Sequence, residues 1–267
     1  MAPIVENNIG YWGNVTSTLD WCEKNYETTF YIAEFWNTVS NVFMIIPPIY
    51  SFISSLATGY EVRTLICYTL LTAVGIGSWL FHMTLKYEMQ LFDELPMLWG
   101  SLFLVFVLAT IAFPYLEDNL TFKMGLFVYG IIATTIYLTL KHPLLFQFSY
   151  GLLVAFILYL NIYVSRFKRC NAKLFYLSSL LYYTGFLIWN IDNIFCDYLH
   201  RLREMIPQVL VPFTQAHAIW HCFAGYGSYI HIYFCAQARA LELKRKVRLS
   251  WDLIGLKLHY GDLNHMK

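Results

Sequence analysis

Five side chains with metal-binding or proton-transfer chemistry lie in or beside apolar stretches of the sequence. Ser78 and His82 are four residues apart, and so are His217 and His221. Side chains four apart stack on one face of a helix, one turn from each other. Asp93 is expected to open the helix that follows the first pair after a short turn. Three imidazoles and a carboxylate suit zinc, which takes three protein nitrogens and keeps its fourth position for water when it is catalytic.

The same residues also have a simpler explanation. A single histidine inside a membrane is more often a hydrogen-bonded packing residue, and two histidines four apart are by themselves a weak motif. An Asp at membrane depth costs on the order of 3 kcal/mol, however, so several polar side chains at one depth favour a functional site. His231 lies ten residues beyond His221, roughly 15 Å farther along a helix, and we interpret it as structural.

A second polar group occurs near the N-terminus. Asp20, Glu23 and Asn25 precede Glu34, which stands at the start of the first apolar stretch. Carboxylate, amide and backbone carbonyl oxygens are the ligands that Ca²⁺ prefers, although the spacing is not that of an EF-hand loop. On spacing alone, a calcium site and a solvated acidic loop both remain open.

Long apolar helices must position these residues. The chain of 267 residues is 58% hydrophobic and only 13% charged, whereas roughly a quarter of a typical soluble domain is charged. Crossing the roughly 30 Å hydrocarbon layer takes about 20 apolar residues per helix. We expect seven such helices, at residues 35–56, 64–84, 92–113, 122–140, 144–164, 174–195 and 213–236.

The distribution of basic residues orients these helices. With the N-terminus outside, 13 of the 18 Lys and Arg residues fall on the inner side, and cytoplasmic loops retain positive charge during insertion. We therefore predict an all-α membrane protein with seven transmembrane helices, a lumenal N-terminus and a cytosolic C-terminus. Its parts are a lumenal segment with the candidate calcium loop, a seven-helix domain and a basic cytosolic tail, at residues 1–34, 35–236 and 237–267.

Two of the six cysteines face the oxidising side under this topology. Cys22 and Cys196 are candidates for a disulfide between the N-terminal segment and the outer end of the sixth helix. The other four are interpreted as packed or free thiols. Close to Cys196, the side chains of Asn190, Asp192 and Asn193 suit hydrogen bonds behind a metal ligand, a substrate head group or a helix cap, and their spacing does not separate these roles.

Several long runs of the sequence resemble the alkaline ceramidases, in particular their type 3 branch, within a wider group of seven-helix hydrolases that includes the adiponectin receptors. The matching runs are at residues 11–13, 17–23, 31–41, 77–79, 81–90, 93–97, 189–196 and 217–221. The resemblance spans residues 11 to about 235, although the fourth and fifth helices match only in hydrophobicity. No metal or catalytic position departs from the family pattern.

This resemblance implies a substrate and a set of site residues. The substrates would be ceramides, cleaved at the amide into sphingosine and a free fatty acid in endoplasmic reticulum and Golgi membranes. The residues implied for zinc are His82, His217 and His221, with Ser78 and Asp93 beside them. The residues implied for calcium are Asp20, Glu23, Asn25 and Glu34, through their side chains, and Trp21, through its carbonyl.

The implied reaction gives each catalytic group a role. Asp93 would take a proton from water and pass it to the leaving amine, and Ser78 would donate a hydrogen bond to the developing oxyanion. An apolar groove among the helices would hold the two lipid tails. The predicted partners are therefore the lipid substrate and the bilayer, and nothing in the sequence indicates a nucleic acid or an obligate protein partner.

Two other functions are alternatives to this hydrolase. The main alternative is a seven-helix receptor in which zinc is only structural, but the third helix has no Asp-Arg-Tyr at its inner end and the seventh has no Asn-Pro-x-x-Tyr. A transporter is a weaker alternative, because no inverted repeat is evident.

Overall fold

The computed structural model describes residues 9–59, 61–251 and 255–261. The long helices are α2 (Val42–Thr58), α3 (Val62–Thr84), α4 (Tyr87–Ala112), α5 (Leu120–Leu140), α6 (Pro143–Phe167), α7 (Ala172–Ile194) and α9 (Ala216–Glu242). The shorter elements are α1 (Phe35–Val39), η1 (Pro114–Leu116), α8 (Cys196–Met205) and η2 (Gln208–Thr214), followed by an antiparallel pair of strands, β1 (Lys246–Trp251) and β2 (Leu256–Gly261).

The predicted apolar stretches correspond to observed helices, and the protein is an all-α, multi-pass membrane protein. Within the described ranges, six helical segments are long and apolar enough to cross a membrane: 35–57, α3, α4, α5, α6 and α7. With 27 residues α9 is also long enough, but it is not among these six. Its three histidines and interspersed Gly, Ser and Tyr residues lower its mean hydropathy.

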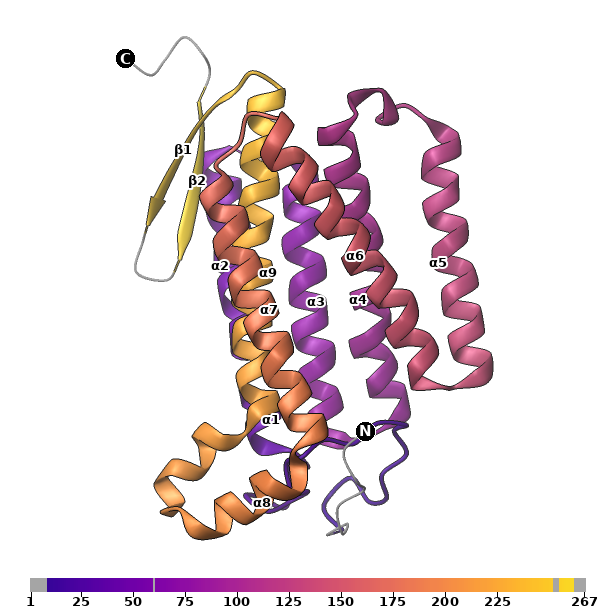
Figure 1. Cartoon of the computed structure of the whole chain (residues 1–267), viewed down its shortest axis with the longest axis vertical. Coiled ribbons are helices and arrows are strands. Elements are labelled where there is room, and N and C mark those ends of the chain that lie inside the picture. The colour runs from indigo at the N-terminus through magenta and orange to yellow at the C-terminus, as the bar shows by residue number, and fades with distance from the viewer. Residues whose placement is uncertain (1–8, 60, 252–254, 262–267) are drawn as a thin grey trace.

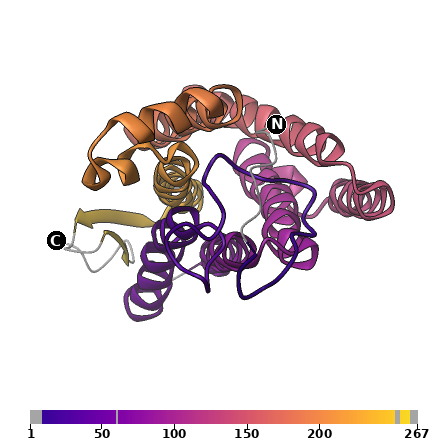
Figure 2. The same cartoon turned by 90° about the horizontal axis from the view of Figure 1, so that it is seen from below.

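Helix α9 lies inside the bundle, where it packs against α2, α3, α4 and α7 (Figures 1 and 2). Buried apolar side chains of α3, α4, α6, α7 and α9 form one continuous core. Helix α5 lies at the edge and packs against α4 and α6. Figure 2 shows the N-terminal segment crossing one end of the bundle, the end at which α1 and α8 also lie.

The turn between α3 and α4 anchors the N-terminal segment. Leu85 adopts a left-handed conformation, with φ of 49°, and its carbonyl accepts hydrogen bonds from the amides of Thr16 and Ser17, both at 3.1 Å. This conformation reverses the chain so quickly that α4 already begins at Tyr87. The prediction that Asp93 opens this helix was therefore wrong, because Asp93 lies in its second turn.

The C-terminal residues form a structure that the sequence analysis did not predict. Helix α9 continues beyond residue 236 to Glu242, and β1 and β2 then form a hairpin. Strand β2 packs against α2 and α9. The hydroxyl of Tyr229 accepts a hydrogen bond from the amide of Leu256 at 3.2 Å, and the hydroxyl of Tyr233 donates one to the carbonyl of the same residue. These contacts join residues that are 27 and 23 positions apart, so the pattern of neighbouring residues does not predict them.

Candidate active site

Three histidines meet at the end of the bundle that the N-terminal segment covers. His82 is in the last turn of α3, and His217 and His221 are in the first two turns of α9. None is more than 3% exposed, and their rings offer ligand nitrogens that all lie within 4.8 Å of one another. The structure thus brings together the three residues that the sequence analysis assigned to zinc.

Contacts with neighbouring side chains orient these rings. Nδ1 of His82 contacts the carboxylate of Glu34, and Nδ1 of His221 lies 2.8 Å from Oγ of Ser40. Nε2 is therefore the nitrogen that each of these two rings retains for a metal. Nδ1 of His217 is buried and has no hydrogen-bond partner among the described residues, while the indole of Trp21 stacks on this ring with centroids 3.8 Å apart. Buried imidazoles that are held by hydrogen bonds behind the ligand nitrogen suit a zinc ion.

Ser78 and Asp93 form a pair next to the histidines. Ser78 precedes His82 by one turn on α3, and its side chain lies close to the carboxyl group of Asp93 on α4. A glycine permits this close approach, because a Cβ at Gly77 would overlap the backbone carbonyl of Phe92. The pair therefore depends on direct backbone contact between the two helices.

The acidic residues of the N-terminal segment gather against the first turn of α1. Glu23 is buried, and its two oxygens accept hydrogen bonds from the amides of Trp36 at 2.7 Å and Asn37 at 2.8 Å, which stabilises the positive end of this helix. Burial nevertheless raises the pKa of Glu23 from 4.5 to about 7. Burial also raises the pKa of Glu34 well above its usual value, and the negative charges of Asp20 and Glu23 raise it further.

This gathering of carboxylates fits a bound cation. Oε1 of Glu34 is buried and has no hydrogen-bond partner in the part of the chain that the structure describes. The side chain of Asn25 and the residue Trp21, the other expected calcium ligands, are buried in the same segment. Because a hard cation would neutralise carboxylates that otherwise repel one another, the donor set suits Ca²⁺.

Asp192 accepts hydrogen bonds behind one of the histidines, which is one of the three roles that its spacing did not separate. It is 1% exposed, and its two oxygens accept hydrogen bonds from the amide of Cys22 at 3.1 Å and from the amide of His217 at 3.2 Å. Its carboxylate therefore joins the N-terminal segment to the first turn of α9, behind one of the histidines. Asn190 and Asn193 instead donate to carbonyls within α7.

A half-buried arginine, Arg203, strengthens this junction. Arg203 of α8 donates hydrogen bonds to the carbonyl of Cys22 at 2.7 Å and to the carbonyl of Thr214, just before α9, at 3.0 Å. It supports the histidine end of the bundle without contacting the histidines. The sequence contains no signal for this role beyond a positive charge in a polar, amphipathic segment.

Comparison with known proteins identifies the family. The family model described as Ceramidase matches residues 13–257. The chain belongs to the ceramidase family. Among its relatives, mouse alkaline ceramidase 3 is 46% identical over 94% of each chain, and the alkaline ceramidase of Arabidopsis thaliana is 33% identical over 90% of this chain and 92% of its own. Human alkaline ceramidase 1 is 28% identical over 77% and 76% of the two chains.

This ceramidase is therefore an enzyme, a membrane-embedded hydrolase with a lipid substrate. The resemblance to the alkaline ceramidases that the sequence analysis described is confirmed. The matched residues run from the N-terminal segment into the C-terminal hairpin. They include the histidine cluster, the Ser78 and Asp93 pair and the acidic residues of the N-terminal segment.

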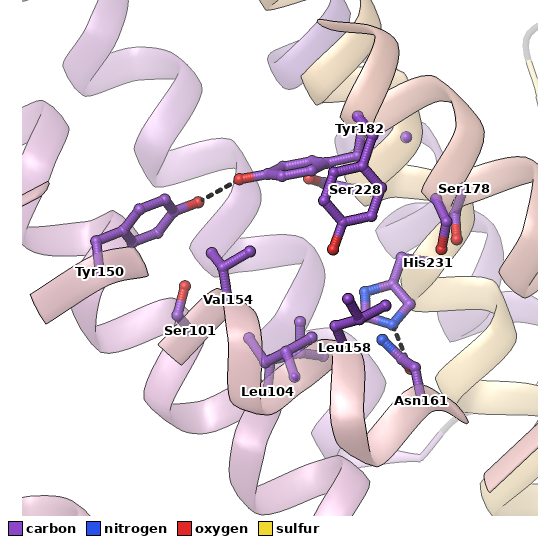
Figure 3. A pocket seen from close by; sticks show the side chains of 14 residues that line it. Ser101, Leu104, Tyr150, Val154, Leu158, Asn161, Ser178, Tyr182, Ser228 and His231 are labelled. Atoms are coloured by element: carbon purple, nitrogen blue, oxygen red, sulfur yellow. Dashed lines mark hydrogen bonds between the residues drawn. The ribbon is translucent and has the colours of Figure 1, made fainter. Parts of the chain in front are cut away.

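The ceramidase also has a partly open pocket of about 110 Å³ among α4, α6, α7 and α9. Figure 3 shows polar side chains around it. The hydroxyls of Tyr150 and Tyr182 are 2.9 Å apart, and the imidazole of His231 lies 2.8 Å from the side-chain oxygen of Asn161. His231 thus has a hydrogen-bonding role away from the other three histidines, in line with its structural interpretation. Leucine, isoleucine and valine side chains complete the lining.

The structure contains the expected disulfide between Cys22 and Cys196, whose Cα atoms are 5.3 Å apart. The bond joins residues separated by 174 positions and fastens the N-terminal segment to the start of α8. Cys67, Cys170 and the other two cysteines are free thiols.

Removing this disulfide is expected to destabilise the ceramidase. In the Cys22→Ala/Cys196→Ala variant the free energy of unfolding should fall by about 2–5 kcal/mol, because the unfolded chain regains the freedom that the cross-link removes. Thermal melts in matched detergent measure the change, and Cys170→Ala serves as the control. Quantitative labelling of Cys22 by a thiol reagent in the native, unreduced protein would contradict the bond.

Proposed function

We propose that this ceramidase is a zinc-dependent amidohydrolase that cleaves ceramides into sphingosine and a free fatty acid. The observation that carries the proposal is the buried cluster of His82, His217 and His221, one helical turn from Ser78, whose side chain lies close to Asp93. Three imidazoles leave one position of a tetrahedral zinc ion open, as a catalytic zinc requires. The orphaned Nδ1 of His217 and the hydrogen bonds behind the other two rings support the same assignment.

The side chains of Asp93 and Ser78 have different roles in amide hydrolysis. Zinc bound to the three histidines would lower the pKa of a water molecule to about 7 and polarise the amide carbonyl. The carboxylate of Asp93 accepts a proton from the attacking water and donates it to the amide nitrogen as the C–N bond breaks. Oγ of Ser78 donates a hydrogen bond to the carbonyl oxygen as negative charge develops there. The fatty acid retains the new C–O bond, and sphingosine leaves as the amine.

We propose that the pocket among α4, α6, α7 and α9 holds part of one lipid tail. It reaches His231, which lies roughly 15 Å along α9 from His221 by helical rise. A ceramide whose amide lies at the histidines would extend its chains toward this depth. The leucine, isoleucine and valine side chains of its walls provide apolar contact for such a tail.

We further propose seven spans, with residues 1–34 in the lumen, the helices of residues 35–236 in the membrane and residues 237–267 in the cytosol. Helix α9 supplies the seventh span. The disulfide supports a lumenal N-terminal segment, because disulfides persist in oxidising compartments. The excess of Lys and Arg on the other side agrees with this orientation. The resemblance to alkaline ceramidases suggests endoplasmic reticulum and Golgi membranes as the location.

Lipid mass spectrometry tests the proposed reaction directly. Purified protein incubated with a ceramide should release equal amounts of sphingosine and fatty acid, should stop after zinc is stripped with a chelator, and should recover when zinc is added back. A protein that binds one zinc and melts higher with it, yet releases no product, would be a receptor with a structural metal and would refute the proposal.

Calcium is expected to stabilise the protein through the acidic residues of the N-terminal segment. At free calcium 100-fold above the dissociation constant, binding adds about 2.7 kcal/mol, which corresponds to a rise in melting temperature of roughly 5 °C or more for a chain of this size. Asp20→Asn should reduce this shift and lower activity while zinc stays near one equivalent. Melts of the wild type titrated with calcium and with a chelator measure the effect.

The Glu34→Gln variant is expected to weaken the binding of both metals, because the Glu34 carboxylate also contacts Nδ1 of His82. This variant should lose the calcium shift and also lower zinc affinity by about 10–100-fold, as expected when the partner behind a ligating histidine is removed. Glu27→Gln, an exposed position of the same segment, is the control and should behave as wild type. If the melting temperature of the wild type does not change over micromolar to millimolar calcium, the segment is an acidic loop that binds no cation.

A further inference from the structure

A basic groove lies at the opposite end of the bundle from the histidines. It has a volume of about 480 Å³ and is lined by Arg169, Leu241, Lys244, Arg245, Lys246, Val247 and Arg248. Five of these seven residues are basic and none is acidic. Arg169 follows the end of α6, and the others belong to the end of α9 and the start of β1. Helix α6 is one of the segments apolar enough to cross a membrane, so the groove lies beside the end of a candidate membrane span.

The way in which α9 ends builds one wall of this groove. The amide of Arg245 bonds to the carbonyl of Ala240 at 2.8 Å, and the amide of Lys244 bonds to the carbonyl of Leu241 at 3.1 Å. This pair of hydrogen bonds is a Schellman motif, in which the left-handed position is usually a glycine. Here a lysine occupies it, with φ of 58°. A lysine in this conformation is strained relative to glycine, so the local backbone favours glycine at this position.

Three acidic residues at this end of the bundle form ion pairs with basic residues outside the groove. Glu61 and Glu117 form ion pairs with Arg63 and Arg239, and the pKa of Glu117 is lowered by these arginines. Glu242 lies 3.6 Å from Lys168. These three carboxylates therefore have basic partners outside the groove, next to its five basic side chains.

We propose that this groove binds the headgroup of an anionic phospholipid that carries phosphate monoester groups, such as a phosphorylated inositol. Several converging guanidinium and ammonium groups match a ligand with several negative charges better than one with a single charge. Leu241 and Val247 provide apolar contact beside the charges, and the membrane edge supplies the lipid. Each basic side chain near an anionic surface contributes roughly a fivefold increase in affinity.

Lys244→Gly tests the groove without weakening the fold. It removes one charge and places the preferred residue at the left-handed position, so the melting temperature should stay the same or rise. The variant is reconstituted in nanodiscs of phosphatidylcholine that contain phosphatidylinositol bisphosphate, and lipid retention is measured by native mass spectrometry. Affinity should fall about fivefold, and Arg245→Gln/Arg248→Gln should lower it by a further factor of similar size per charge.

Lys141→Gly is the matched control. Lys141 also has a left-handed backbone, with φ of 49°, but it ends α5 at the other end of the bundle. It should retain the lipid as wild type does. The same affinity in Lys244→Gly and in the double variant as in wild type would overturn the proposal. Retention of phosphatidylserine equal to that of the phosphoinositide would also overturn it, as would equally tight binding of soluble inositol phosphate or inorganic phosphate. None of these measurements depends on ceramide turnover.

Discussion

Replacing His217 with alanine is expected to remove bound zinc and to lower ceramide turnover by about a thousandfold or more. The metal supplies several kcal/mol of transition-state stabilisation, and about 4 kcal/mol corresponds to a thousandfold in rate. His82→Ala should have the same effect, because each ring provides one of three ligand nitrogens that lie within 4.8 Å of one another. Elemental analysis of purified protein and release of sphingosine measure the two losses together.

His231→Ala is the control for these variants. His231 is also buried in α9, but its ring bonds to Asn161 rather than to the cluster. It should retain a full equivalent of zinc. A full equivalent of zinc in His217→Ala would mean that the three histidines do not form the metal site.

The second large effect is expected at Asp93, where turnover and zinc content should separate. Asp93→Asn keeps the size of the side chain but cannot carry the proton, so turnover should fall by about 10²–10⁴-fold while zinc stays near one equivalent. Ser78→Ala should lower turnover by about 10²–10³-fold, as expected when one donor to an oxyanion is removed. Single-turnover assays with metal analysis of the same samples distinguish these outcomes from the histidine variants.

The neighbouring carboxyl group provides the control. Glu94 is buried and accepts hydrogen bonds from Gln90 at 3.0 Å and from Tyr137, so it joins α4 to α5. Glu94→Gln should affect stability more than turnover. Undiminished turnover in Asp93→Asn would exclude Asp93 as the proton carrier.

The parts of the candidate site that depend on spacing within one helix could be predicted from the sequence. His217 and His221 share a face because they are one helical turn apart, and the apolar stretches around them have the length of a membrane span. The side chain of Asp93 lies close to Ser78, but the prediction that Asp93 opens its helix was wrong. The left-handed conformation of Leu85 shortens the turn between α3 and α4. No motif in the sequence predicts that conformation at a leucine.

The sequence by itself determined the membrane class, the approximate helix limits and the residues that meet at one end, because hydropathy and helical spacing act within one segment. Only the tertiary structure decided how those residues are held. Glu34 contacts His82 across 48 positions, Ser40 contacts His221 across 181, and Asp192 contacts Cys22 across 170. The hairpin on α2 and α9 likewise depends on distant contacts. Such hydrogen bonds form only after the helices pack, because the energy of each depends on a partner that the local sequence does not specify.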